Sequence, residues 1–182
     1  MKRLVLILFI PFFLLACGPK EVNLVPYTSP NYPITFQLPE SWVVEDNEDS
    51  ITIASSEALL LDGMMTNGAR INITVAPSFF TGTAVATEVI DTAVRNFRDQ
   101  EETEIIQDIE PTNINAQTAV QTVLRGPDIN GNEIILRYMV IENLTVNVTA
   151  VVAAVHDANQ NDQYGQLMAD IVNSIQLSGE TP

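Results

Sequence analysis

The chain has 182 residues and a formal net charge of −15, from 23 acidic and 8 basic residues. This balance argues against nucleic acid as a partner, because binding to phosphates depends on Lys and Arg. The single cysteine excludes a disulfide within the chain and a zinc site built from several cysteines. No glycine-rich nucleotide motif and no metalloprotease motif occurs, so the sequence predicts no cofactor.

The N-terminus has the pattern of an export signal. Lys2 and Arg3 precede twelve apolar residues, 4–15, and then Ala16 and Cys17. Twelve helical residues span about 18 Å, well short of the roughly 30 Å core of a bilayer. The small residue before Cys17 resembles a bacterial lipobox, which implies cleavage after residue 16 and thioether lipidation of Cys17, with palmitate as an expected acyl chain. We expect an extracytoplasmic protein of the cell envelope, held to the membrane by this lipid; the alternative is an ordinary secreted protein with a stray cysteine.

The remaining chain has the length of one domain. Removal of residues 1–16, the predicted lipoprotein signal peptide, leaves 166 residues, with six basic against 23 acidic residues and a formal charge of −17. Residues 17–26 contain two prolines and no sustained period, which predicts a lipidated tether. The folded domain is expected over residues 27–178, followed by a C-terminal tail over 179–182.

The first half of the domain reads as strands. Apolar residues alternate with polar ones over 34–38, a turn follows at 39–41, and 42–44 and 51–53 continue as short strands. Residues 69–75 alternate in the same way before Pro77. The aromatic side chain of Trp42 is predicted to lie in the core between sheet and helix.

A helix and further strands follow. From Thr83, one stripe of a helix carries the apolar residues Val85, Val89, Ile90, Ala93, Val94 and Phe97. Strands are predicted over 104–110, 118–125 and 133–141, the last two joined through Asn130-Gly131, a pair favoured in hairpins. A turn at Glu142-Asn143 should lead into a central strand over 144–155, apolar on both faces in its second half.

The chain ends in an amphipathic helix. Its apolar residues run at helical spacing from Tyr164 to Ile175, and Asn161 or Asp162 is the predicted N-cap. Short turns between consecutive strands exclude an all-parallel arrangement, because a parallel connection needs a long crossover. The sequence therefore predicts an α+β fold with a mainly antiparallel sheet and helices packed on it.

The order of these elements resembles the PsbP-like family. The resemblance rests on an opening aromatic residue, Tyr27, the segment 34–42 (ITFQLPESW) and the closing segment 171–175 (IVNSI). It implies an α/β/α sandwich around an antiparallel sheet, and a binding or accessory module rather than an enzyme. Known members include an extrinsic photosystem II subunit, a nuclear-import regulator that binds a small GTPase, and bacterial lipoproteins. The photosystem subunits dock through a basic N-terminal segment, whereas the tether here has one lysine, which argues against that role.

Acidic clusters raise the alternative of a divalent-cation-binding lipoprotein. They lie at residues 45–49, 99–110, 128–133 and 157–162. The last comes closest to a calcium loop but lacks the glycine at its sixth position and the final bidentate Glu. We therefore expect solvated loops and no metal site.

A surface-anchored hydrolase is the other alternative. His156 is the only histidine, so histidine-based acid-base chemistry would have to use it. It lies at the end of a predicted strand beside Asp157, and no serine stands in a nucleophile elbow. A capping or turn role is the expectation for His156, and no catalytic residue is predicted.

Two apolar loop segments are the candidates for contact with a protein partner. Phe79 and Phe80 precede the first long helix, and Met64 and Met65 end an apolar stretch that begins at Leu59. Large apolar residues on loops mark contact surfaces, and methionine adapts to different partners. The competing interpretation is that these side chains cover the helix start and the sheet edge.

Overall fold

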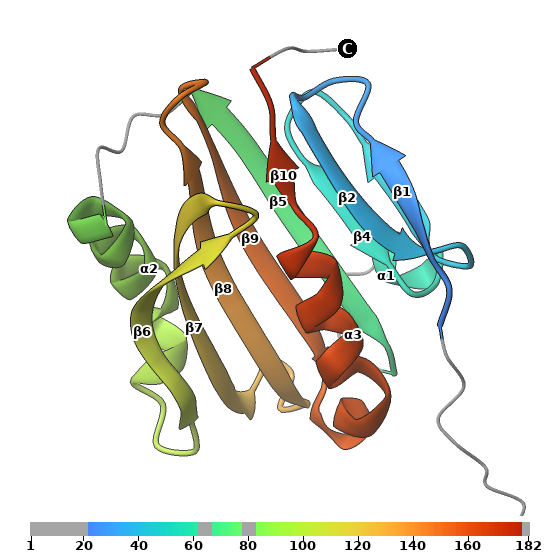
Figure 1. Cartoon of the computed structure of the whole chain (residues 1–182). Helices are drawn as coiled ribbons and strands as arrows, with labels where there is room; N and C mark the ends of the chain where they lie inside the picture. The colour runs from blue at the N-terminus through green and yellow to red at the C-terminus, as the bar shows by residue number, and fades with distance from the viewer. Residues whose placement is uncertain (1–21, 62–66, 78–82, 180–182) are drawn as a thin grey trace, which may run out of the picture.

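The computed structural model describes residues 22–61, 67–77 and 83–179, and within them the chain forms two antiparallel sheets and three α-helices (Figure 1). The larger sheet has the order β3-β4-β5-β9-β8-β7-β6, and the smaller one has the order β1-β2-β10. The strands are β1 (Leu24–Thr28), β2 (Ile34–Pro39), β3 (Val43–Asp46), β4 (Ile51–Ala54), β5 (Ala69–Pro77), β6 (Glu104–Ile114), β7 (Gln117–Pro127), β8 (Glu133–Asn143), β9 (Val148–Asp157) and β10 (Gln176–Leu177). The helices are α1 (Ala58–Leu61), α2 (Thr83–Arg98) and α3 (Asn161–Asn173), with a single 3-10 turn, η1 (Ala158–Gln160), before α3.

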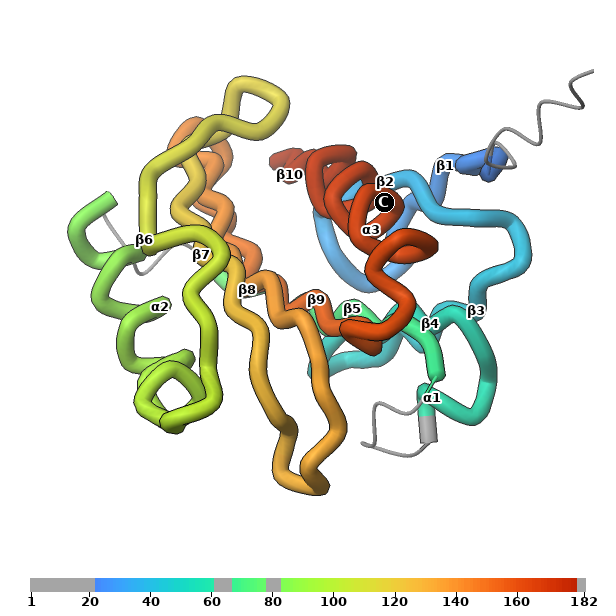
Figure 2. The backbone as a smooth tube through the Cα atoms, turned by 90° about the horizontal axis from the view of Figure 1, so that it is seen from below, coloured from blue at the N-terminus to red at the C-terminus, as the bar shows by residue number. Residues whose placement is uncertain are grey.

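The larger sheet forms the middle layer of a sandwich. Helix α2 packs on one face, over β6, β7 and β8, while α3 and the smaller sheet lie on the other face (Figures 1 and 2). This arrangement confirms the predicted α+β class and the antiparallel sheet. The second, smaller sheet is an addition to the prediction, because β10 follows α3 directly and pairs with β2.

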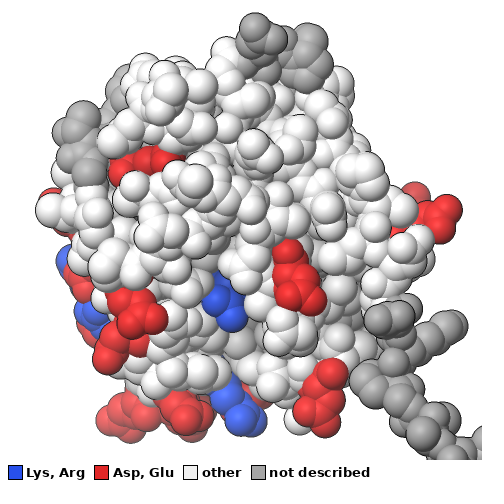
Figure 3. All heavy atoms as spheres, viewed as in Figure 1, with Lys and Arg blue, Asp and Glu red and all other residues white. Residues whose placement is uncertain are grey.

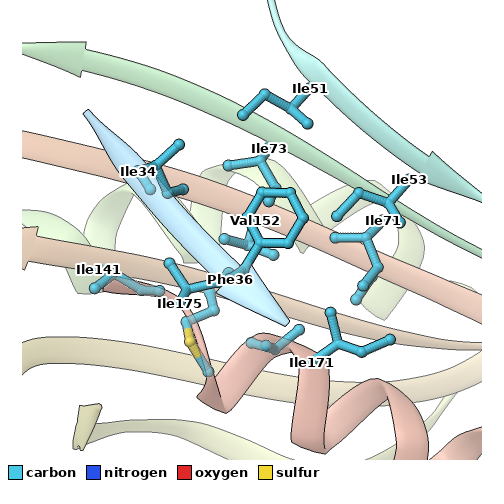
Figure 4. Close-up of a cluster of buried hydrophobic side chains, with 14 of the residues drawn as sticks. Ile34, Phe36, Ile51, Ile53, Ile71, Ile73, Ile141, Val152, Ile171 and Ile175 are labelled. Carbon is cyan, nitrogen blue, oxygen red and sulfur yellow. The ribbon is translucent and has the colours of Figure 1, made fainter. Parts of the chain in front are cut away.

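The main core fills the space between the smaller sheet, α3 and the β4-β5-β9 part of the larger sheet (Figure 4). Phe36 of β2 lies over Ile71 and Ile73 of β5, and Ile171 of α3 closes the cluster. The alternation predicted over 34–38 and 69–75 is thereby confirmed. Each of these side chains, when fully buried, contributes about 1.5 to 3 kcal/mol relative to exposure.

A second core lies beneath α2. Ala86, Ile90 and Val94 are buried against Val120 and Leu124 of β7. The predicted stripe was wrong at Ala93, which is exposed, and it missed Ala86. The buried row follows i, i+4, i+8, because the helix lies along the sheet on that line of side chains.

Strand β9 is the middle strand of the larger sheet, as expected. Its predicted start was wrong. β8 continues to Asn143, and β9 begins only at Val148. The turn between them uses Asn147 at a φ of 58°, and the backbone N–H of Thr145 donates to Oδ1 of Asn143. Asparagine tolerates a positive φ, and its side-chain oxygen can accept a hydrogen bond from the backbone N–H two residues later. Residues 144–147 therefore form a turn instead of extending the strand.

Two expectations for the N-terminal part are corrected. β1 begins at Leu24, inside the segment predicted as tether, and Pro26 is accommodated because β1 is an edge strand. Trp42 is half-buried rather than deeply buried. Its ring packs at the margin of the main core, in an edge-to-face contact with Tyr164 of α3 at 6.1 Å between centroids.

In the parts of the chain described, no helix is both long and apolar enough to cross a bilayer.

Candidate functional site

A cavity of about 220 Å³ lies beside α3 on the face of the larger sheet that α2 does not cover. Its floor is formed by Val123 of β7, Ile135 and Arg137 of β8, and Ala154 and His156 of β9. Figure 2 shows the arrangement, with α3 on one side of β8 and the β6–β7 pair on the other. We call this cavity the α3 pocket.

The strand register brings the floor residues together. Arg137 is opposite Val123 on β7 and opposite Ala154 on β9, so the three side chains form one row across the sheet. Ile135 and His156 form the adjacent row, two residues further along each strand.

The walls of the α3 pocket come from two other elements. Helix α3 contributes Asn161, its first residue, together with Gly165, Gln166 and Met168 further along the helix. Ile106 of β6 lines the opposite wall and is half exposed, at 51%. The lining is therefore mostly apolar, with amide groups along the helix side.

Of the described residues that line the α3 pocket, Arg137 alone is charged. Its Nη1 donates a hydrogen bond to Oε1 of Gln121, 2.9 Å long. Among the described residues, the ion pairs involve Arg95, Arg98 and Arg125, and none involves Arg137. Burial lowers the pKa of its guanidinium below the ordinary arginine value, but an arginine remains protonated in proteins. The pocket thus holds a half-buried positive charge that no carboxylate among the described residues neutralises.

His156 is buried in β9, with 4% of its surface exposed, and does not occupy a turn as expected. Its Nε2 lies 3.1 Å from Oδ1 of Asn161, so the ring donates this hydrogen bond to the amide oxygen. Burial lowers the pKa of His156 from 6.5, and the nearby Arg137 charge lowers it further, against the opposing effects of Asn161 and Asp157. The ring is therefore neutral near neutral pH.

The start of α3 also differs from the prediction, which placed its N-cap at Asn161 or Asp162. Gln160 is the N-cap residue and makes no side-chain capping bond, while Asp157 caps η1 by accepting from the N–H of Asn159. Asn161, predicted as a cap, is used to contact His156. Gly165 leaves room for it, since a Cβ there would lie 2.5 Å from Oδ1 of Asn161.

Two residues of the acidic clusters, Asp46 and Asp128, have structural roles. Asp46 accepts hydrogen bonds from the hydroxyl of Tyr27 and the amide of Asn31, and burial together with this contact raises the pKa of Tyr27 to about 12. Asp128 accepts from the backbone N–H groups of Asn130 and Asn132 within the β7–β8 hairpin. Within residues 22–61, 67–77 and 83–179, no three His, Cys, Asp or Glu side chains converge to hold a metal ion.

The predicted lipidation and partner residues lie outside the described residues. They are Cys17, Met64, Met65, Phe79 and Phe80. Leu59, at the start of the apolar stretch, is buried in α1 against Ala54 and Ile134.

The sequence prediction missed Arg137. A signal was present, because it is the one charged residue in the otherwise apolar or aromatic run of residues 134–141 (IILRYMVI). A lone charge within a strand near the centre of a sheet calls for a partner or a function. Figure 3 shows a basic group near the middle of this face, with one acidic group a short way to its right and the other acidic groups nearer the margins.

Comparison with known proteins gives similarity at the level of structure. No family model and no curated protein sequence matches the chain. The Ran-binding protein Mog1p of Saccharomyces cerevisiae superimposes with a TM-score of 0.57 at 10% identity, over 86% of this chain and 96% of Mog1p. LpqN, involved in cell envelope biogenesis of Mycobacterium tuberculosis, gives 0.57 at 12% identity, over 87% of this chain and 92% of LpqN.

Cyanobacterial PsbP (CyanoP) from Synechocystis gives a TM-score of 0.54 at 14% identity, over 91% of this chain and 99% of CyanoP. Such low identities establish the fold and no site. The chain therefore has the PsbP-like fold that the order of its sequence elements predicted, shared with Mog1p, CyanoP and LpqN.

Proposed function

We propose that this chain is a non-catalytic binding module whose ligand site is the α3 pocket. One observation carries the proposal, namely that Arg137 holds a half-buried charge in a cavity where no carboxylate of the described residues neutralises it. Keeping a cation partly out of water without a counter-charge destabilises a fold, which supports retention of this group for an anionic ligand.

The lining of the α3 pocket supports binding over hydrolysis. The described part of the lining includes no serine, threonine, cysteine or carboxylate that His156 could activate as a nucleophile. The ring of His156 instead donates to the amide of Asn161. The similar folds support the same role, since Mog1p is a Ran-binding protein.

We further propose that lipid on Cys17 tethers the module to the extracytoplasmic side of a membrane. The export signal and the lipobox-like residues before Cys17 support this location. The likeness to LpqN, a protein involved in cell envelope biogenesis, fits it as well. Phe79, Phe80, Met64 and Met65 remain the proposed contacts for a protein partner, to be tested by partner recovery after Phe79→Ser with Phe80→Ser.

Native mass spectrometry of the chain purified from membranes of its host tests the binding role. We expect a bound molecule on the wild-type protein and its loss from Arg137→Gln. Arg125→Gln is the matched control, because Arg125 lies on the same sheet but pairs with Glu133 at 2.8 Å in a more exposed position. Absence of any bound molecule, or equal loss from both variants, would contradict a ligand site at Arg137.

A further inference from the structure

We infer that the α3 pocket binds a monoanion in which a carboxylate is joined to a short apolar chain, with the carboxylate held by Arg137. This inference rests on the proposed function, since it names the ligand of the same pocket. It follows from the charge, the hydrogen-bond donors and the apolar lining of the cavity.

The charge of the pocket matches one negative charge. Arg137 is the only charged group in its lining, and the His156 ring beside it is neutral near neutral pH. A phosphate dianion would leave an excess negative charge in a half-buried site. The chain as a whole, with a formal charge of −15, also repels multivalent anions.

The donors of Arg137 suit a carboxylate. A guanidinium carries five N–H donors in a plane, and within the described residues one of them is used, by Gln121. A carboxylate takes two parallel hydrogen bonds from such a group, which fixes both its position and its orientation. The α3 side of the pocket adds the amides of Asn161, whose Oδ1 accepts from His156, and of Gln166, whose Nε2 donates to Asp170 at 2.7 Å. An amide NH2 group has two N–H donors, so each retains at least one for a ligand.

The rest of the lining suits an apolar chain. Ile106, Val123, Ile135, Ala154 and Met168 surround Arg137 in the cavity. The volume of about 220 Å³ lies below the roughly 300 to 1,000 Å³ of sites for larger ligands, so a chain of only a few carbons fits. Each methylene buried there should raise affinity about fourfold.

His156 provides a local reporter of binding, because it is the only histidine and lines the pocket. The ring-proton NMR signal of the full chain, in detergent and without a histidine tag, is followed while hexanoate is added. We expect a saturable shift with hexanoate, weaker binding of butanoate, and no shift with hexanamide or hexylamine at ten times the concentration.

Variants separate the role of Arg137 from a general effect. Arg137→Gln should weaken hexanoate binding at least about tenfold. Arg137→Lys keeps the charge but loses the planar guanidinium, so its affinity for hexanoate should lie between those of Arg137→Gln and the wild type. Arg125→Gln should change affinity less than about twofold. Equal binding of hexanamide, or equal losses in Arg137→Gln and Arg125→Gln, would overturn the inference.

A free acid and the C-terminal residue of a peptide share this chemistry, and one further arm distinguishes them. The probe is acetyl-Ala-Ala-Leu with a free C-terminus, and its C-terminal amide is the control. The peptide acid should bind more tightly than hexanoate if a peptide C-terminus is the natural ligand, and more weakly than hexanoate if a free acid is. Tighter binding of inorganic phosphate than of hexanoate would contradict a carboxylate site. An Arg137-dependent adduct in native mass spectrometry without a carboxylate would overturn the ligand class alone, whereas a lack of any adduct would overturn the proposed function.

Discussion

Gly165 and Asn161 share the space beside His156. A Cβ on Gly165 would lie 2.5 Å from Oδ1 of Asn161, the same oxygen that accepts the hydrogen bond from Nε2 of His156 at 3.1 Å. Asn161 is exposed, so its side chain can rotate away from such a Cβ at little cost. The absence of a side chain at position 165 therefore keeps the contact between α3 and β9 in place.

Gly165→Ala is expected to separate stability from the environment of His156. Alanine gains about 1 kcal/mol over glycine inside a helix, so the variant should unfold at the same or a higher temperature. Displacement of Asn161 removes the hydrogen bond that raises the pKa of His156, so that pKa should fall below its wild-type value. An NMR titration of the single histidine measures it, and Asn161→Ala should give the same fall. An unchanged pKa in both variants would show that the contact has no effect on the ring.

Arg137→Met should stabilise the ligand-free protein. The substitution removes a half-buried cation that no carboxylate neutralises and keeps a similar length of chain. We expect a gain of about 0.5 to 2 kcal/mol in the free energy of unfolding, measured by urea denaturation. Arg125→Met, at a more exposed pair, should stay within about 0.5 kcal/mol. A clear loss of stability in Arg137→Met would assign Arg137 a structural role instead.

The stability of the protein should decrease as the pH is lowered, because His156 becomes protonated. Its pKa is lowered from 6.5 in the folded state, so the unfolded chain binds the proton first. The contribution is complete above about pH 6.5 and is lost as the pH falls toward the folded pKa. Arg137, Asp157 and Asn161 are the groups that act on the ring.

His156→Gln isolates this effect from the titration of the many carboxylates. The wild type should lose stability relative to the variant below about pH 6.5, by at most about 1.4 kcal/mol per pH unit, the limit for one proton. Thermal or urea unfolding of both proteins between pH 5 and 8 measures the difference. Parallel stability curves for the two proteins would mean that the folded pKa of His156 is not lowered.

Trp42→Ala should destabilise the protein less than Phe36→Ala. Trp42 is half-buried beside Tyr164, whereas Phe36 is 2% exposed in the main core. Removal of a fully buried aromatic side chain costs about 3 to 5 kcal/mol, and we expect about 1 to 3 kcal/mol for Trp42. Denaturant unfolding of both variants gives the order, and a larger loss for Trp42→Ala would place its ring deeper in the core than the structure does.

Cys17→Ser should release the protein from membranes or block its processing. The acidic chain offers no electrostatic attachment to anionic lipids, so acyl chains are the proposed anchor. Fractionation of host cells, with a high-salt wash, compares the variant with the wild type. Retention of Cys17→Ser in the washed membranes would mean that another attachment exists.

The strands were predictable because alternation reports directly which face is buried. Ile71 and Ile73 identify β5 without any knowledge of its neighbours, and the apolar second half of β9 indicates its central place. The α3 pocket was not predictable in this way. It depends on which residues of β7 and β9 lie opposite Arg137, and strand register across a sheet is a tertiary property.

The N-terminus of α3 shows why local signals failed in detail. Asn161 has a side chain suited to capping, and the sequence around it is rich in such residues. In the folded chain, His156 competes for the same amide oxygen from the preceding strand. The hydrogen bond between His156 and Asn161, across the turn that joins β9 to α3, thus determines the role of Asn161, although its local preference is for helix capping.

The early start of β1 limits how far the domain can stand from a membrane. Leu24 follows Cys17 by seven residues, and a chain of that length reaches at most about 25 Å when fully extended. A lipid on Cys17 would accordingly hold the β1 end of the domain within that reach of the membrane surface.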